Sequence, residues 1–163
     1  MSVVPVRIDF GPARPEDLPQ LVELLHILFT QEHELTPDAS KQERGLRQIL
    51  ENPSIGRLYV ARDGARVLGM VNIQRTMSTA EGGPVGSFED FVVRPELRGQ
   101  GLGARLMRYA IEQCEAEGLL RLILLTDGDN AGAQRLYEKA GFERSGMLPM
   151  RLRLSIRPRT GRT

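Results

Sequence analysis

The stretch that decides the fold is VVRPELRGQGLGARLM (residues 92–107), which joins an apolar run to a helix-like run. Three of its glycines, Gly99, Gly101 and Gly103, fall within five positions. Glycine weakens the interior of a strand or a helix, because it loses the most backbone freedom on folding. The backbone N–H groups that open a helix lack partners inside it and carry partial positive charge. The stretch therefore fits an anion-binding turn at a strand-to-helix junction, although the glycines alone would favour a glycine-rich turn without a ligand.

Hydrophobic periodicity predicts a mixed succession of elements around this turn. Helices are expected over residues 14–29, 38–51, 101–117 and 130–140. Strands are expected over 6–13, 55–62, 66–78, 85–93 and 119–126, with two closing strands near 142–146 and 149–156. The run over 119–126, LLRLILLT, is expected to be a strand buried on both faces. The predicted order is β-α-α-β-β-β-α-β-α-β-β, in one α/β (α+β) domain over 1–156 with a flexible Arg-rich tail over 157–163.

Composition and charge argue against several classes of protein. The chain is 40% hydrophobic and 26% charged, as an ordinary globular domain is. No apolar run approaches the ~20 residues of a membrane span, and the opening residues do not resemble a secretion signal. With a single cysteine, a cytoplasmic location is expected. Residues 151–163 hold five arginines and no acid, which leaves 17 basic against 21 acidic residues in 1–150. The domain itself therefore lacks the basic surface of a nucleic-acid binder, and we expect neither nucleic acid nor membrane as a partner.

A dinucleotide fingerprint is the main rival interpretation of the glycine-rich turn. Gly99, Gly101 and Ala104 satisfy G-x-G-x-x-G/A. That fingerprint normally opens the first βαβ unit of a doubly wound sheet. Here nearly 100 residues come first, including two predicted helices and a run of three predicted strands. The order of elements therefore argues against a dinucleotide site.

The same residues resemble a known family in two separate motifs. VVRPELRGQGLGARLM resembles motif A of the GNAT superfamily, the acetyl-CoA-dependent N-acetyltransferases, whose signature R/Q-x-x-G-x-G/A matches Arg98, Gly101 and Gly103. NAGAQRLYEKAGF (130–142) resembles motif B, and ARPEDLPQLVELL (13–25) resembles the usual first strand and helix. The resemblance covers about residues 5–156. It implies the GNAT acyl-CoA N-acyltransferase fold, a mixed and mostly antiparallel central sheet flanked by helices.

The resemblance also implies which residues hold acetyl-CoA. The backbone of Phe91, Val92 and Val93 is expected to bind the pantetheine arm where two parallel central strands diverge, and backbone N–H groups there are expected to polarise the acetyl carbonyl. The pyrophosphate is expected on the backbone of Arg98, Gly99, Gln100, Gly101, Leu102, Gly103 and Ala104. Asn130 and Ala133 are expected to flank pantetheine from the other side, with Asn130 also suited to cap its own helix. Tyr137 holds the position of the motif B tyrosine, the general acid toward the coenzyme sulfur; packing of its ring on the sheet is the simpler interpretation.

Acetyl transfer to an amine needs a proton acceptor, because a free alkylamine has a pKa near ~10. Glu89 is the candidate general base, and Asp90 is assigned to orienting the substrate or to structure. Strand alternation places Glu89, Phe91 and Val93 on one face together with Ser87, unless a bulge shifts the register. Asp90 would then point the opposite way, with Phe88 and Val92. The simpler interpretation is a pair of solvated strand acids.

The predicted function is acetyl transfer to a primary amine by direct attack in a ternary complex. FEDFVVRPELRGQGLG (88–103) is similar to the diamine (spermidine/spermine) acetyltransferase branch, so a small polyamine-like or amino-acid-like acceptor is favoured. A protein N-terminus or lysine is the alternative acceptor. A non-catalytic acyl-CoA-binding sensor is the alternative class. A homodimer through the closing strands is a further hypothesis.

Other reactive residues are given lesser roles. Cys114 shares a helical face with Met107, Ala110 and Ile111, which favours a core thiol over a nucleophile. His26 and His33 lie near the first helix without an apparent ligand cluster, so no metal is expected. The segment with Glu32, His33, Glu34 and Asp38 borders the acceptor site in this superfamily, as a solvated loop or as a recognition element for a cationic amine. Asp127 and Asp129 are interpreted as turn and cap residues.

Overall fold

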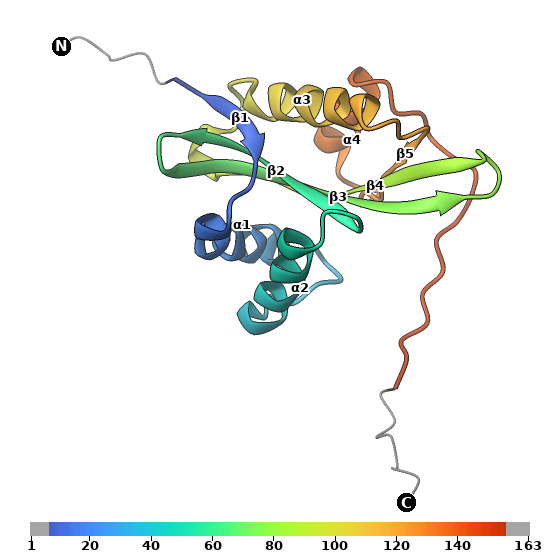
Figure 1. Cartoon of the computed structure of the whole chain (residues 1–163), viewed down its shortest axis with the longest axis horizontal. Helices are drawn as coiled ribbons and strands as arrows, with labels where there is room; N and C mark the ends of the chain where they lie inside the picture. Colours follow the sequence, from blue (N-terminus) through green and yellow to red (C-terminus); the bar gives the residue numbers. More distant parts are fainter. Residues whose placement is uncertain (1–6, 156–163) are drawn as a thin grey trace, which may run out of the picture.

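The computed structural model describes residues 7–155 and shows one twisted sheet with helices on both faces (Figure 1). The strands are β1 (Asp9–Pro12), β2 (Gly56–Asp63), β3 (Arg66–Ser78), β4 (Gly83–Val93) and β5 (Leu122–Ile123). The α-helices are α1 (Leu18–Gln31), α2 (Ala39–Glu51), α3 (Leu102–Ala116) and α4 (Ala131–Lys139), with short 3₁₀ turns at Pro15–Asp17 and Pro95–Leu97. The predicted order of elements is confirmed as far as the helix over 130–140, which is α4.

The sheet has five strands in the order β1-β2-β3-β4-β5. The first three pairings are antiparallel, and β4 pairs with β5 in parallel only at Gly86 with Leu122 and Ser87 with Ile123. Beyond Ser87, the part of β4 that runs to Val93 therefore has no ladder partner on its β5 side among the described residues. The expected parallel pairing that ends partway along β4 is confirmed, but β5 is an edge strand among the described residues, so the expectation that both strands are central is wrong.

Apolar side chains form one core on each face of the sheet. The α1–α2 core contains Leu18, Leu21, Leu24, Leu25, Leu46, Leu58, Val60, Val67, Met70 and Val92. The α3 core contains Tyr59, Ala61, Leu68, Val71, Ile73, Phe88, Val93, Leu102, Leu106, Met107, Ala110 and Cys114. Figure 1 shows the same division, with α1 and α2 on one side of the sheet and α3 and α4 on the other. The amphipathic helices thus bury their apolar faces where the sequence periodicity predicts.

A β-bulge at Asp90 changes which side chains share a face. Val92 pairs with Met70 but Glu89 pairs with Asn72, so Asp90 and Phe91 together oppose a single residue of β3. Asp90 has φ +51, a left-handed conformation that Asp tolerates better than most residues. Phe91 consequently packs with the α3 core, as Val93 and Phe88 do. The predicted grouping of Glu89 with Phe91 and Val93 is therefore wrong, because simple alternation fails at the bulge.

The end of the chain departs from the prediction. The segments near 142–146 and 149–155 form no strand within the described residues, and β5 is two residues long rather than eight. Arg144 instead donates to Glu138 and Gln134 of α4, at 2.9 and 3.0 Å, and Pro149 has no N–H to give to a ladder. Ile123 of β5 is 51% exposed and Leu125, just after the strand, is 72% exposed, so the expectation of burial on both faces is wrong. The tail over 157–163 lies outside the described residues.

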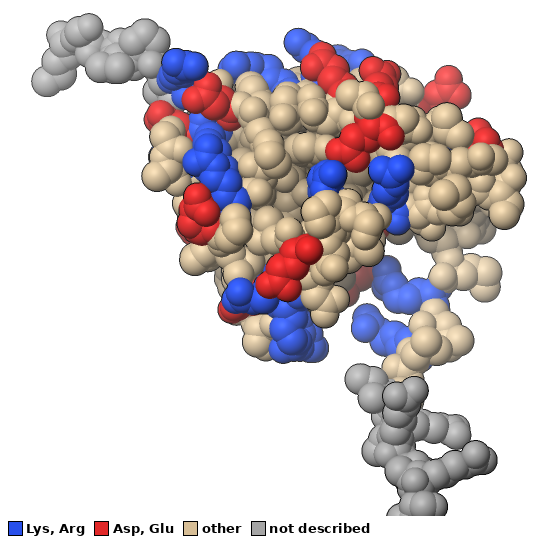
Figure 2. All heavy atoms as spheres, viewed as in Figure 1, with Lys and Arg blue, Asp and Glu red and all other residues tan. Residues whose placement is uncertain are grey.

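Charges of both signs are interspersed over the face of the molecule shown in Figure 2. Basic and acidic side chains alternate there, and no broad single-sign surface is visible in that view. None of the helices in the described part of the chain is long and apolar enough to cross a bilayer.

Candidate active site

The N-terminus of α3 is an open backbone cradle. Gly99 and Gly101 have φ +74 and +80, which a residue with a Cβ adopts only under strain. A Cβ added to either would meet no atom within 4 Å, so it would project into open space above the turn. Among the described residues, none accepts a hydrogen bond from the backbone N–H groups of 99–104; Arg105, which follows, donates to Gly101 O at 3.2 Å. This row of free donors at the positive end of a 15-residue helix suits an anion.

Contacts with β4 fix the inner wall of the cradle. A Cβ at Gly103 would lie 3.3 Å from Phe91 Cζ, so this glycine lets α3 approach the strand closely. Arg98 Nε donates to Val93 O at 3.1 Å, which draws the Arg98 side chain back over the end of β4. Arg98, Phe91 and Val93 thus lie beside the free N–H groups.

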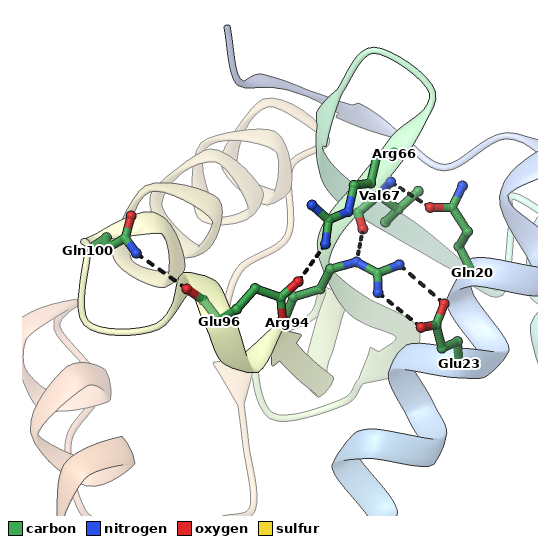
Figure 3. Close-up of polar contacts among 7 residues, drawn as sticks. All are labelled: Gln20, Glu23, Arg66, Val67, Arg94, Glu96 and Gln100. Carbon is green, nitrogen blue, oxygen red and sulfur yellow. Dashed lines mark hydrogen bonds and ion pairs between the residues drawn. The ribbon is translucent and has the colours of Figure 1, made fainter. Parts of the chain in front are cut away.

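An ion-pair network anchors the turn in front of the cradle (Figure 3). The buried Arg94 donates from Nε to Val67 O at 2.6 Å and from its two terminal nitrogens to Glu23 at 3.1 and 3.3 Å. The hydrogen bonds from Arg94 lower the pKa of Glu23 against a smaller opposing effect of burial. Glu96 accepts from Arg66, and Glu96 O accepts from Gln100 at 3.4 Å. The turn from 94 to 100 is therefore tied to α1 and to β3.

Aromatic rings fill the space between β4 and α4. Tyr137 lies with its ring centroid 6.4 Å from that of Phe91, 6.3 Å from that of Phe88 and 6.1 Å from that of Phe142. Burial raises the pKa of Tyr137, and the negative charge of Glu32 raises it further. The phenol therefore keeps its proton at neutral pH and can act as a donor.

The two strand acids lie in different surroundings. Glu89 is exposed and accepts a hydrogen bond from Ser87 Oγ at 2.8 Å. Asp90 is half-buried and accepts from the buried Asn72 Nδ2 at 2.9 Å. Burial raises the pKa of Asp90 in spite of the Asn72 hydrogen bond, and the negative charge of Glu89 adds to the increase. The bulge thus separates the neighbouring acids into one solvated and one partly desolvated carboxyl group.

Further acids come close to Asp90 from distant parts of the chain. Burial raises the pKa of Glu32, just after α1, and the negative charges of Asp127 and Asp90 raise it further. His33, Asp127 and Asp129 place ligand-type atoms within 4.8 Å of one another, with His33 Nε2 3.6 Å from Asp129. The expectation that His33 has no such neighbours is wrong, because α1 and the loop after β5 meet only in the folded chain. No sequence spacing signals this acidic surface.

The remaining sequence assignments divide between caps and core. Asn130 Oδ1 accepts from Ala133 N at 3.1 Å, which confirms the capping role of Asn130 at α4. Val92 turns its side chain into the α1–α2 core, so only its backbone is available to a ligand. Burial raises the pKa of Cys114 to about 11, with Glu117 and Glu115 contributing. A thiol that stays protonated in the core is a poor nucleophile, as the sequence predicts.

Known proteins share this arrangement over most of the chain. The profile of the acetyltransferase (GNAT) family matches residues 18–142. A Bacillus subtilis (strain 168) protein, named provisionally as a ribosomal protein bS18 alanine N-acetyltransferase, is 34% identical over 100 residues, which is 61% of this chain and 62% of that protein. The aminoalkylphosphonate N-acetyltransferase of Salmonella typhimurium (strain LT2) is 27% identical over 101 residues, which is 62% of this chain and 65% of that protein. Each alignment spans less than two thirds of the relative's own length.

A solved structure extends the match to almost the whole chain. A Clostridium acetobutylicum protein, named as a predicted acetyltransferase and determined with acetyl-CoA, superposes with a TM-score of 0.73 over 89% of this chain and 96% of its own, at 16% identity. At that identity the superposition supports the fold alone. The two curated relatives are named for different acceptors, neither of which is a diamine. Together with the glycine cradle, the profile match over residues 18–142 shows that this chain belongs to the GNAT acetyltransferase family.

Proposed function

We propose that this chain transfers an acetyl group from acetyl-CoA to a small primary amine by direct attack in a ternary complex. The observation that carries the proposal is the row of free backbone N–H groups over 99–104, which opens beside the unpaired part of β4 and the ring of Tyr137. Such a row suits a diphosphate, and an unpaired strand edge suits an amide-containing arm. The diphosphate and the amide-containing arm are both parts of coenzyme A.

The residues present fit that cosubstrate. The open space above Gly99 and Gly101 is space that a Cβ would enter, so the backbone there can approach a phosphate closely. The cradle over 98–104 would hold the diphosphate, the backbone of Phe91, Val92 and Val93 the pantetheine arm, and Asn130 and Ala133 its other side. When bound, acetyl-CoA supplies an acetyl group activated as a thioester.

The chain's own residues would manage the protons of the reaction. An acceptor in its ammonium form first gives one proton to Glu89, directly or through water, because only a neutral nitrogen can attack. A nitrogen–carbon bond to the acetyl group then forms, the carbon–sulfur bond breaks, and the nitrogen gives its second proton to solvent water. Glu89 returns the first proton to solvent before the next turnover. Tyr137, whose pKa is raised, gives its proton to the leaving sulfur and takes one back from solvent.

The acceptor side of the site favours a cation. Asp90, Glu32 and Asp127 lie near one another between α1, β4 and the loop after β5, so an ammonium group would be attracted to this surface. The similarity of residues 88–103 to the diamine branch supports a small amine. A protein N-terminus or lysine stays the alternative acceptor, since one relative is named for a ribosomal protein.

Release of the coenzyme thiol in the presence of a panel of amines tests the proposal. We expect thiol release with at least one small primary amine, and a large loss of kcat in Glu89→Gln with unchanged affinity for coenzyme A. General bases typically contribute about 10²–10⁴-fold to rate. Coenzyme binding without turnover of any amine or peptide would instead favour the non-catalytic sensor.

A further inference from the structure

A cavity of about 230 Å³ lies between the sheet and the α1–α2 layer, on the face to which the bulge turns Asp90. We name it the α2 cavity. Its apolar wall is formed by Leu25 and Phe29 of α1 together with Leu46 and Ile49 of α2. This volume is well above the ~10–15 Å³ that a single water needs. The α2 cavity is thus large enough for the body of a small organic amine.

The sheet side of the α2 cavity carries a buried polar atom without a partner. Asn72 lines the cavity and is 2% exposed. Its Nδ2 donates to Asp90, but its Oδ1 is buried and makes no hydrogen bond to any described residue. An unsatisfied buried acceptor costs about 1–3 kcal/mol, so it marks a place where a donor is missing. A bound ammonium group would supply that donor.

Asp90 stands at the same end of the cavity in a strained conformation. Its φ of +51 is the only positive value at a non-glycine residue in the described chain. Strained backbone of this kind persists where the surrounding structure holds it, and it concentrates at functional sites. The bulge places the Asp90 carboxyl group on the cavity face of the sheet, next to Asn72. Simple strand alternation would instead place it on the opposite face, with Phe88 and the α3 core.

The charges on the α2 cavity limit what it can hold. Asp90 is the single carboxylate among its lining residues, and the charge of Lys41, whose side chain is 70% exposed, is offset by Asp38 at 3.6 Å. Gln42 and Gln74 complete the polar lining with neutral amides. A ligand with one ammonium group at the Asp90 end therefore matches this lining, whereas a second ammonium group would find only neutral amides or the apolar wall within the lining.

We propose that the α2 cavity binds the acceptor amine, and that this acceptor is a monoamine with a compact, uncharged and mainly apolar body. Its ammonium group donates to Asp90 and to Asn72 Oδ1, and its body packs against Leu46 and Phe29. The inference rests on the proposed acetyl transfer and narrows its substrate. It argues against a polyamine, which the similarity to the diamine branch favours.

Pentylamine and putrescine test this inference, because they have the same length and differ in a terminal methyl against a terminal ammonium group. With acetyl-CoA saturating, we expect kcat/KM for pentylamine to exceed that for putrescine at least about tenfold, since a charge on an apolar wall is costly. A higher kcat/KM for putrescine would overturn the inference while leaving acetyl transfer standing. Coenzyme binding without turnover of either amine, or of any other, would overturn the proposed function as well.

Gly45→Leu tests whether the cavity itself holds the acceptor. Gly45 lines the cavity from α2, a Cβ there would meet nothing within 4 Å, and leucine favours a helix more than glycine does. We expect folding to be retained and KM for pentylamine to rise about tenfold, which is ~1.4 kcal/mol. The matched control is Gln48→Leu, which adds the same side chain at an exposed position of α2 away from the cavity lining. An unchanged KM in Gly45→Leu, or an equal increase in both variants, would overturn the inference.

Discussion

Asn72 and Asp90 face each other across neighbouring strands, with Asn72 Nδ2 donating to Asp90 Oδ2 at 2.9 Å. The register shift between β3 and β4 brings this pair together, because Glu89 takes the place opposite Asn72 and leaves Asp90 in the bulge. Burial makes the ionised form of Asp90 unfavourable, and its pKa is raised. The fold therefore keeps a carboxyl group on the face of the α2 cavity at a cost in stability.

That cost can be measured with Asp90→Asn. Because the pKa of Asp90 is raised, the protonated carboxyl group stabilises the fold, and this contribution is complete below the ordinary pKa of 3.8. It is lost as pH rises through the raised pKa. We expect Asp90→Asn to raise Tm at pH ~7 and to match the wild type near pH ~3, because asparagine also tolerates a positive φ. Thermal melts across this range check it. A lower Tm for the variant at neutral pH would show that the charge stabilises the fold.

The buried ion pair between Arg62 and Asp17 has the opposite pH dependence. Burial by itself would raise the pKa of Asp17. Arg62 donates to both Asp17 oxygens, at 3.1 and 2.6 Å, and these hydrogen bonds, the one from Arg14 N and the two positive charges together lower that pKa. Its contribution to stability is present above the ordinary pKa of 3.8 and is lost as pH falls through the lowered value.

Asp17→Asn should therefore lower the free energy of unfolding by about 3–5 kcal/mol at neutral pH, because Arg62 is left charged and buried. Urea titrations at neutral and acidic pH measure this difference, which should shrink in acid. Asp9→Asn, which removes the exposed partner of Arg7, is the control and should change stability by less than about 1 kcal/mol. Equal effects of the two substitutions would contradict the account.

Tyr137→Phe separates the hydroxyl group of Tyr137 from its ring. The ring contacts with Phe91 and Phe142 are retained by phenylalanine, so folding and affinity for coenzyme A should be unchanged. We expect kcat to fall about 10²–10⁴-fold, the usual contribution of a general acid. Steady-state kinetics with the best amine, together with calorimetry of coenzyme binding, make the comparison. Retained kcat would exclude Tyr137 as the acid.

Arg94 is expected to support the coenzyme site from behind. Arg94→Met removes the donors to Val67 O and Glu23, at a cost of about 2–3 kcal/mol in stability, and releases the turn that leads to the cradle. Because this turn leads into the cradle, the affinity for coenzyme A should also fall in Arg94→Met. Arg66→Met, which breaks a more exposed contact with Glu96, should change both quantities much less. Unchanged coenzyme affinity in Arg94→Met would show that the network serves stability alone.

The sequence predicts the parts of this molecule that depend on local spacing. The glycines of the cradle, the helix that follows them and the Asn130 cap can all be found from residue type and position. The bulge at Asp90 cannot, because it is defined by the partner strand. The meeting of Glu32 with Asp127 depends on tertiary structure, and the segment after Phe142 packs on α4 through Arg144 where periodicity predicts a strand.

Calorimetric titration with coenzyme A tests the central claim, which is that the backbone over 99–104 binds the diphosphate. The informative pair is Gly101→Ala and Gly118→Ala, because the two glycines have φ +80 and +76 and an added Cβ meets nothing within 4 Å at either. Each should lose about 1–2 kcal/mol of stability. We predict that the wild type and Gly118→Ala bind coenzyme A with similar Kd, and that Gly101→Ala binds at least about tenfold more weakly. Absence of binding heat in the wild type, or equal affinity in the two variants, would contradict the claim.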